Sequence, residues 1–228
     1  MVATAATSRP DWRRLGEMAG LDEAMVRATC TAKRYDRGEV VFHEGDPAGS
    51  LHLIDRGRVA VRLTTPLGEV GTLDVLQSGD TFGEQGLVDG IGERTATVTA
   101  LERTETLALD RAQFDQLRSE RPGVDRFVVL VLSARLQWTS RLLIDALYLP
   151  ADVRVMRSVA RMHALFSLDG GGTIPLTQSD IASMAGVTRS TANRVLKQAQ
   201  VDGVVRVGRA TLDVLDVARL QRQAGFVR

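Results

Sequence analysis

Two segments of the sequence carry residues that could bind a ligand, and the first lies between residues 82 and 95. Phe82-Gly83-Glu84-Gln85-Gly86-Leu87 is followed by Arg94-Thr95. Glycine-rich backbone at a helix start offers amide donors to a phosphate, and an arginine adds a fixed positive charge. A carboxylate repels a phosphate but accepts a hydrogen bond from a sugar hydroxyl. This segment therefore predicts Glu84 on a ribose and Arg94 on a phosphate, with a surface ion pair between the two as an equal alternative.

The second segment predicts a helix-turn-helix. Thr177-Gln178-Ser179-Asp180 has the pattern of a capping box that opens a helix, Gly186 ends that helix, and Thr188 can cap a second one. Two helices joined by a glycine-containing turn are typical of DNA-binding proteins. A generic helical pair would explain the apolar spacing but not the caps together with an outward row of basic residues.

The candidate DNA contacts follow from this helix pair. The first turns of the second helix reach base edges, and arginine can bind guanine O6 and N7 together. The candidate base readers are Arg189, Ser190 and Arg194. Polar residues at helix N-termini suit phosphate contacts, and the candidates are Thr177, Gln178, Thr188 and Thr191, with Lys197 on the same outward row.

Charge is distributed in agreement with this prediction. The whole chain has a formal net charge of +1. From Gly186 to the end it has eight basic and three acidic residues, which gives 8 − 3 = +5. A basic terminal module is the expected electrostatic footprint of phosphate contact.

The elements that must position these residues change character along the chain. Residues 11–30 predict two short helices, and residues 31–109 contain short β-branched runs separated by Gly and Asp, which predict an all-β roll or barrel. The absence of βαβ alternation argues against a Rossmann unit. Residues 110–118 predict a short helix. A hairpin wing is expected over residues 204–215 and a turn over residues 169–172.

A long helix is expected over residues 124–149, because Pro150 disfavours helical geometry in the residue before it. Its stripe steps by three and four residues and consists of Val129, Leu132, Leu136, Thr139, Leu143 and Ala146. Such a stripe favours packing against a second copy of the helix over packing on its own domain. A hydroxyl at Thr139 is costly in a seam unless something bonds to it, and a ligand could do so. Leu149-Pro150 then reads as a hinge before a helix over residues 151–166.

Composition excludes several classes of protein. The single cysteine, Cys30, excludes an internal disulfide framework and a cluster held by several thiolates. The spacing of His43, His52 and His163 favours structural or solvated roles over metal binding. No uninterrupted apolar run approaches the length of a membrane span, and residues 1–10 are polar and read as a loose terminus. We therefore expect a cytoplasmic protein with no metal and no membrane partner.

Taken jointly and in order, three motifs resemble the CRP/FNR superfamily of transcription regulators. They are Phe82-Gly83-Glu84 through Arg94-Thr95, Arg135 through Ser140, and Gly186-Val187-Thr188-Arg189 through Arg194. The resemblance covers roughly residues 15 to 215. It implies an α+β fold with a cyclic-nucleotide-binding β-roll (jelly roll) over residues 11–122, a dimerisation helix over 123–149 and a winged helix-turn-helix over 150–228.

The resemblance also implies roles for residues of the first segment and of the long helix. Gly83 and Glu84 would hold the cyclic phosphate and the ribose 2′-hydroxyl, and Arg94 and Thr95 the phosphate. Arg135 would support the site from the long helix. Thr139 and Ser140 would meet the base, with Ser140 coming from the partner chain. The implied effector is cyclic AMP, and cyclic GMP is the runner-up.

The resulting hypothesis is a non-enzymatic homodimer that couples an effector to binding of a near-palindromic site in double-stranded DNA, with RNA polymerase as a further partner. One alternative is a cyclic-nucleotide module that regulates an interaction or an enzyme and has no affinity for duplex DNA. Another is a regulator active without ligand, with a vestigial pocket. Three residues depart from the family pattern: Gln85 in place of an aliphatic residue, Ser190 in place of glutamate, and Pro150 in place of an acidic residue.

Overall fold

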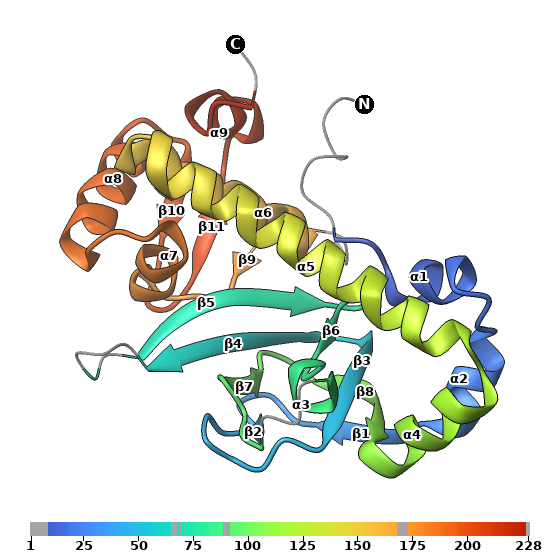
Figure 1. The fold of residues 1–228 in the computed structure, drawn as a ribbon. Coiled ribbons are helices and arrows are strands. Elements are labelled where there is room, and N and C mark those ends of the chain that lie inside the picture. Colours follow the sequence, from blue (N-terminus) through green and yellow to red (C-terminus); the bar gives the residue numbers. More distant parts are fainter. Residues whose placement is uncertain (1–8, 65–67, 69, 89–91, 168–172, 227–228) are drawn as a thin grey trace. The chain divides into compact units, whose positions relative to one another are not determined.

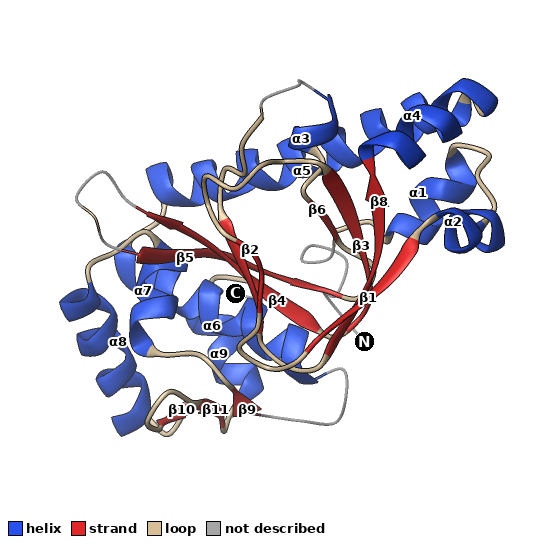
Figure 2. Ribbon diagram, turned by 90° about the horizontal axis from the view of Figure 1, so that it is seen from below, coloured by secondary structure: helices blue, strands red, loops and turns tan. Residues whose placement is uncertain are grey.

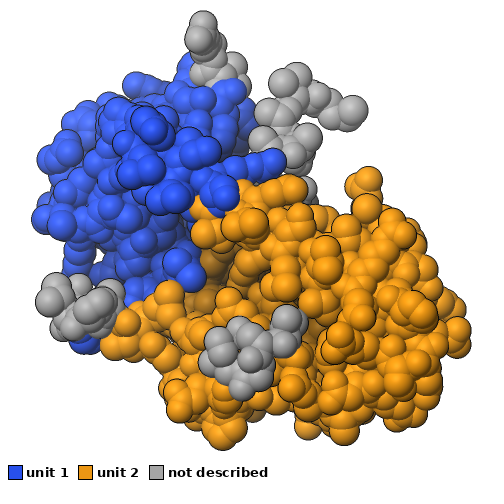
Figure 3. Space-filling model, viewed as in Figure 1, with its two compact units in different colours: residues 1–8, 65–73, 140–228 blue, residues 9–64, 74–139 orange. Residues whose placement is uncertain are grey.

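The computed structural model describes residues 9–64, 68, 70–88, 92–167 and 173–226 of the chain. Within this range it divides into two compact units (Figure 3). The β-rich unit contains residues 9–64 and 74–139, and the C-terminal unit contains residues 140–226 together with the described part of 65–73. The turn expected over residues 169–172 and the first eight residues of the loose terminus expected over residues 1–10 lie outside the described residues. Arg9 is not loose, because it forms ion pairs with Asp74 and Asp80.

The elements of the β-rich unit alternate little between helix and strand (Figure 1). Two short helices come first, α1 (Trp12–Met18) and α2 (Glu23–Thr29), and each begins at an aspartate cap. The strands are β1 (Thr31–Tyr35), β2 (Val40–Phe42), β3 (Ser50–Arg56), β4 (Arg58–Thr64), β5 (Val70–Gln77), β6 (Thr81–Phe82), β7 (Thr97–Ala100) and β8 (Thr104–Asp110). The helices α3 (Gln85–Val88), α4 (Arg111–Glu120) and α5 (Gly123–Tyr148) complete the series.

The strands form two four-stranded sheets, drawn in red in Figure 2, with the orders β1-β8-β3-β6 and β2-β7-β4-β5. Non-consecutive strands pair in both sheets, and the registers of the described pairs are antiparallel. One buried cluster draws on both sheets, with Ile54 and Phe82 from the first sheet and Val61, Leu76 and Val98 from the second. The expected β-roll is thus present, with a core shared by its two sheets.

A second buried cluster attaches the helices to the roll. Trp12 is buried, and its Nε1 donates to the Ile54 carbonyl at 3.1 Å. Phe114 from α4 and Val124 and Phe127 from the first turns of α5 join the same cluster. The beginning of α5 is therefore held against the β-rich unit, which places the following turns of α5 beside the loop that contains Glu84.

The C-terminal unit contains the end of α5 and a small helical domain with a three-stranded sheet. Its elements are α6 (Ala151–Ser167), β9 (Thr173–Ile174), α7 (Gln178–Ala185), α8 (Arg189–Val201), β10 (Val205–Val207), β11 (Leu212–Val214) and α9 (Val217–Gln223). The expected wing is the β10–β11 hairpin, and β9 pairs with β11 as a third strand. Arg157 on α6 forms an ion pair with Asp145 at 2.7 Å, so the last turns of α5 belong to this unit.

Helix α5 leaves its apolar stripe uncovered in the single chain. Val129, Leu136 and Leu143 are 64%, 68% and 57% exposed. By length and composition alone, α5 could also cross a membrane, although no uninterrupted apolar run suggested this in the sequence. Its exposed apolar residues recur at the spacing of a coiled-coil seam, which is the pattern expected of a helix that packs against another helix.

Candidate functional site

The loop before α3 is shaped by Gly83. Its φ of +83° lies in the left-handed region. A Cβ at this position would lie 2.7 Å from Arg94 Nη1 and 2.7 Å from the Ser50 carbonyl oxygen. Glycine is therefore required here for two reasons, backbone conformation and the close approach of the arginine.

Arg94 is buried and its guanidinium is held in one orientation. Nη1 donates to the Ser50 carbonyl at 2.8 Å, and Nη2 donates to the Ser50 hydroxyl at 2.8 Å. The Phe42 ring packs under the guanidinium, with its centroid 4.0 Å from Cζ. Burial lowers the pKa of Arg94, and the carboxylates of Asp46 and Glu84 oppose that shift. Among the described residues, Arg94 Nε has no hydrogen-bond partner.

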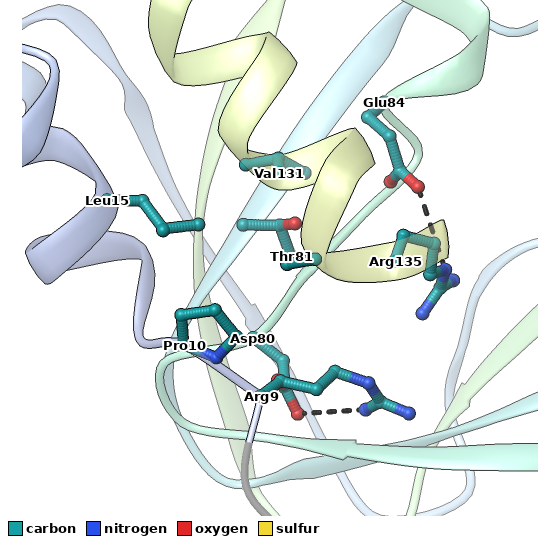
Figure 4. Close-up of a pocket in the computed structure, with 9 residues that line it drawn as sticks. Arg9, Pro10, Leu15, Asp80, Thr81, Glu84, Val131 and Arg135 are labelled. Carbon is teal, nitrogen blue, oxygen red and sulfur yellow. Dashed lines mark hydrogen bonds and ion pairs between the residues drawn. The ribbon is translucent and has the colours of Figure 1, made fainter. Parts of the chain in front are cut away.

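Glu84 is 5% exposed and pairs with the long helix (Figure 4). Arg135 Nε lies 3.8 Å from Glu84 Oε1, and both side chains line a pocket with Thr81 and Val131. The other carboxylate oxygen, Oε2, has no partner among the described residues. The alternative of a surface ion pair between Glu84 and Arg94 is wrong, because both residues are buried and Glu84 pairs with Arg135 instead.

The remaining predicted ligand residues are placed at the rim. Thr95 is exposed, and its hydroxyl donates to Gln85 Oε1 at 3.0 Å. Gln85, which departs from the family pattern, therefore engages one of the groups expected to bind phosphate. Thr139 and Ser140 are exposed on α5, and Thr139 lies one helical turn after Arg135. The structure groups Gly83, Glu84, Arg94, Thr95 and Arg135 and leaves Thr139 and Ser140 facing solvent in the single chain.

Three residues beside the predicted ligand residues were not predicted from the sequence. Ser50 binds Arg94 through its carbonyl and its hydroxyl. His52 is buried, and its Nε2 lies 3.0 Å from Ser50 Oγ. Arg9 lines the pocket, forms ion pairs with Asp74 and with Asp80, and lies over the Trp138 ring. A Ser-x-His alternation places both side chains on one face of β3, and this alternation is the sequence signal that could have identified the first two.

The burial of His52 makes a prediction about stability. Burial, and then the charges of Arg94 and Lys33, lower the pKa of His52 to about 3. In the unfolded chain the pKa of this histidine is about 6.5. Between about pH 3 and pH 6.5 the unfolded chain therefore binds a proton at His52, and the folded chain does not. Stability is therefore expected to fall as the pH decreases from about 6.5 toward 3, with a loss from this residue of about 2 kcal/mol at pH 5.

Urea unfolding of the wild type and of His52→Phe at about pH 7.5 and about pH 5 measures this difference. The other titrating groups are present in both proteins, including Asp80, whose pKa is raised by burial. Their contributions cancel in the comparison. Equal losses of unfolding free energy in the two proteins would contradict a neutral, buried His52.

The helix pair of the C-terminal unit has the predicted caps. The Thr177 side chain accepts from the Asp180 backbone while the Asp180 side chain accepts from the Thr177 backbone, which is a capping box. Gly186 ends α7 with a φ of +61° in the left-handed region. The Thr188 hydroxyl caps α8 by accepting from the Thr191 backbone at 3.2 Å. The predicted helix-turn-helix is confirmed at each of these positions.

The residues expected to contact DNA lie on α7, on α8 and at the N-terminal caps of these helices. The side chains of Arg189, Ser190, Arg194 and Lys197 are exposed on α8. The Ser190 hydroxyl contacts the Thr188 hydroxyl at 3.0 Å, so it takes part in the cap cluster. Arg154 Nη2 on α6 donates to the Gly186 carbonyl at 3.2 Å and braces the turn between the helices. In the described part of the chain, no three or more His, Cys, Asp or Glu side chains are grouped as metal ligands would be.

Comparison with known proteins identifies both parts of the chain. Residues 32–121 match the family model of the cyclic nucleotide-binding domain, and residues 153–223 match that of the Crp-like helix-turn-helix domain. The cyclic AMP receptor protein of Thermus thermophilus is 36% identical over 194 residues, which cover 83% of this chain and 86% of that protein.

Two further relatives support the comparison, and the first of them covers more of the chain. The CRP-like cAMP-activated global transcriptional regulator of Mycobacterium tuberculosis is 28% identical over 218 residues, which cover 92% of this chain and 97% of that protein. The solved structure of the c-di-GMP-responsive global regulator of Xanthomonas campestris is 25% identical, covers 83% of this chain and 96% of that one, and superposes with a TM-score of 0.69. The relatives are transcription regulators and not enzymes. The chain belongs to the CRP/FNR superfamily of transcription regulators, with a cyclic nucleotide-binding domain followed by a Crp-like helix-turn-helix.

Proposed function

We propose that this regulator binds cyclic AMP between the side chains of Glu84 and Arg94 and that the bound nucleotide controls its affinity for DNA. One observation carries the proposal: two buried polar atoms of opposite character, Glu84 Oε2 and Arg94 Nε, have no partner among the described residues. Leaving such atoms unpaired costs about 1–3 kcal/mol each or more. A ribose hydroxyl that donates to the carboxylate and a phosphate that accepts from the guanidinium would pair both atoms.

Thr139 and Ser140 are proposed to meet the base. Their hydroxyls can accept from the exocyclic amine of adenine, which favours cyclic AMP. Thr95 could accept from the exocyclic amine of guanine if the base turned over the phosphate, so cyclic GMP is the second candidate. Two of the relatives are named for cAMP and the third for c-di-GMP, so that dinucleotide also belongs in the test.

The proposed assembly is a homodimer through α5. The exposed stripe that includes Val129, Leu136 and Leu143 requires a cover in water. A second copy of the same helix would supply it and would place the partner's Ser140 near the base. The division at residues 122 and 149 into nucleotide-binding domain, dimerisation helix and DNA-binding domain belongs to the same proposal, as do RNA polymerase as a partner and a cytoplasmic location.

Calorimetric titration with cyclic AMP, cyclic GMP and c-di-GMP tests the effector. We expect one nucleotide bound per chain, with cyclic AMP tighter than cyclic GMP. If cyclic GMP or c-di-GMP binds more tightly, that nucleotide is the effector, and the proposal of a nucleotide-regulated DNA-binding protein stands. Absence of binding by any of the three at millimolar concentration would leave a regulator that acts without a nucleotide.

The proposed DNA contacts are those of the α8 row and the helix caps, and Arg194 is the most telling. Its side chain is exposed in the second turn of α8, which supports a contact with a base edge. We expect Arg194→Ala to weaken binding to a selected duplex by about 1–3 kcal/mol, and to weaken binding to unrelated duplexes much less. Fluorescence anisotropy with both duplexes at one salt concentration measures the two losses.

Arg118→Ala is the matched control, because it removes an exposed arginine of the β-rich unit that pairs with Asp125 at 2.7 Å. Both variants have the same net charge. If Arg194→Ala weakens binding equally to all duplexes, Arg194 contacts a phosphate and not a base. If it weakens binding no more than Arg118→Ala does, Arg194 does not contact DNA.

A further inference from the structure

Ser50 occupies the end edge of the Arg94 guanidinium, and Nη1 also donates to the Gly83 carbonyl at 3.4 Å. The Ser50 carbonyl accepts from Nη1 and its hydroxyl accepts from Nη2, each at 2.8 Å. Nε is the atom without a partner among the described residues. The side edge, formed by Nε and the second hydrogen of Nη2, is therefore the edge that can take two phosphate oxygens as a bidentate pair.

The Ser50 hydroxyl is in turn oriented by His52. Because arginine only donates, Ser50 Oγ accepts from Nη2 and keeps its own hydrogen for another acceptor. His52 Nε2 lies 3.0 Å from Ser50 Oγ and can accept that hydrogen when the ring is neutral and carries its proton on Nδ1. Nδ1 lies 3.1 Å from the Thr106 hydroxyl, which can accept from it. The donors then run in one direction, from Arg94 to Ser50, His52 and Thr106.

The surroundings of His52 keep the ring neutral and immobile. The burial of the ring and the positive charges of Arg94 and Lys33 all lower the pKa of His52. The imidazole stacks on the Phe82 ring with centroids 4.8 Å apart and an angle of 4°, and Phe82 is its cross-strand partner. Phe82 also contacts Phe42, the ring under the Arg94 guanidinium. An imidazolium would offer Ser50 a donor where an acceptor is needed.

We propose that His52 and Ser50 are positioning residues for effector binding: a neutral His52 orients the Ser50 hydroxyl, and Ser50 turns the Nε–Nη2 edge of Arg94 toward the phosphate of the cyclic nucleotide. The inference rests on the proposed function, because the anion is the phosphate of the proposed effector. Neither residue touches the ligand. Both act through Arg94.

The test uses the full chain and compares His52→Phe, Ser50→Ala and the double variant. Phenylalanine keeps the stacked ring and removes both nitrogens, and alanine keeps the Ser50 carbonyl and removes the hydroxyl. We expect each single change to weaken cyclic AMP binding by about tenfold. The double change should weaken it no further, because both changes break the same chain of hydrogen bonds from Arg94 to His52. If the two losses of affinity multiply in the double variant, Ser50 and His52 act independently and the inference is wrong.

Two phosphorothioate analogues of cyclic AMP, in which sulfur replaces one or the other exocyclic oxygen, report the orientation of the guanidinium. The wild type is expected to prefer one diastereomer, and His52→Phe to lose that preference. If the His52 ring only packs in the core, His52→Phe would leave the ratio of the affinities for the two diastereomers unchanged. His52→Gln, whose amide oxygen can reach the position of Nε2, should restore affinity and preference, whereas His52→Asn, which reaches only the position of Nδ1, should not.

The outcomes separate this inference from the function on which it rests. A wild type that binds cyclic AMP, together with a His52→Phe variant of equal affinity and equal diastereomer preference, overturns the inference alone. A wild type that binds no cyclic nucleotide contradicts the proposed function itself. Thermal unfolding of each variant verifies that it is folded. If His52→Phe does not fold, two other single variants decide the question: Ser50→Ala should weaken cyclic AMP binding, and His52→Gln should keep it.

Discussion

Replacing Arg94 by leucine is expected to remove most measurable binding of cyclic AMP. The phosphate would lose a charged bidentate partner in a buried site, and each charge-assisted hydrogen bond contributes about 1.5–3 kcal/mol. Two such bonds correspond to a loss of affinity on the order of 100-fold or more. Arg94→Lys, which keeps the charge but not the planar fork, should lie between the wild type and Arg94→Leu. Isothermal titration calorimetry measures all three proteins.

Arg34→Leu is the control for the same loss of charge. Arg34 is exposed on β1, and its ion pair with Glu105 at 3.3 Å lies at the surface. We expect this variant to bind as the wild type does. If a folded Arg94→Leu protein binds cyclic AMP as tightly as the wild type does, the phosphate does not bind at Arg94.

Leu136→Glu is expected to convert the dimer into monomers. In the proposed seam the two Leu136 side chains face each other, so the change would bury two carboxylates in an apolar contact, at a cost of several kcal/mol. Leu136 is 68% exposed in the single chain, so its own fold does not depend on this side chain. Sedimentation velocity at low micromolar concentration reports the mass of the assembly.

Val201→Glu is the matched control, since Val201 is 81% exposed at the end of α8 and lies outside the stripe. It should leave the dimer intact. A Leu136→Glu protein that remains dimeric at the same concentration would place the interface on another surface.

The sequence predicts the helices of this fold better than its strands. The caps at Thr177 and Thr188, the left-handed Gly186 and the boundary before Pro150 are local signals, and each appears at or within one residue of its expected place. Strand β1 lies in the range predicted to be β-rich, but Thr31–Tyr35 shows no clear strand pattern of its own because it is polar and largely exposed. The strand forms through pairing with β8, whose residues lie 69 to 77 positions later in the chain, from Thr31 opposite Ala108 to Tyr35 opposite Thr104.

The pocket shows the same limit. Glu84 and Arg94 were predicted because their motif is contiguous enough to recognise in the sequence. The role of His52 depends on Phe82 from β6 and Thr106 from β8, which become its neighbours only after the sheet has formed. The partner of Glu84 likewise comes from α5, whereas the sequence had left an ion pair with Arg94 as an equal alternative.

The central claim is that a nucleotide in the β-rich unit controls DNA binding by the helix-turn-helix, and one measurement tests it directly. The affinity for a duplex selected by the protein from a random pool is compared with and without saturating cyclic AMP, for the wild type and Arg94→Leu. Coupling free energies of about 1–3 kcal/mol predict a change of about 5- to 150-fold in the wild type and none in the variant, with the reciprocal change in nucleotide affinity when DNA is bound. Tight binding to the duplex that is indifferent to the nucleotide in both proteins would contradict the account.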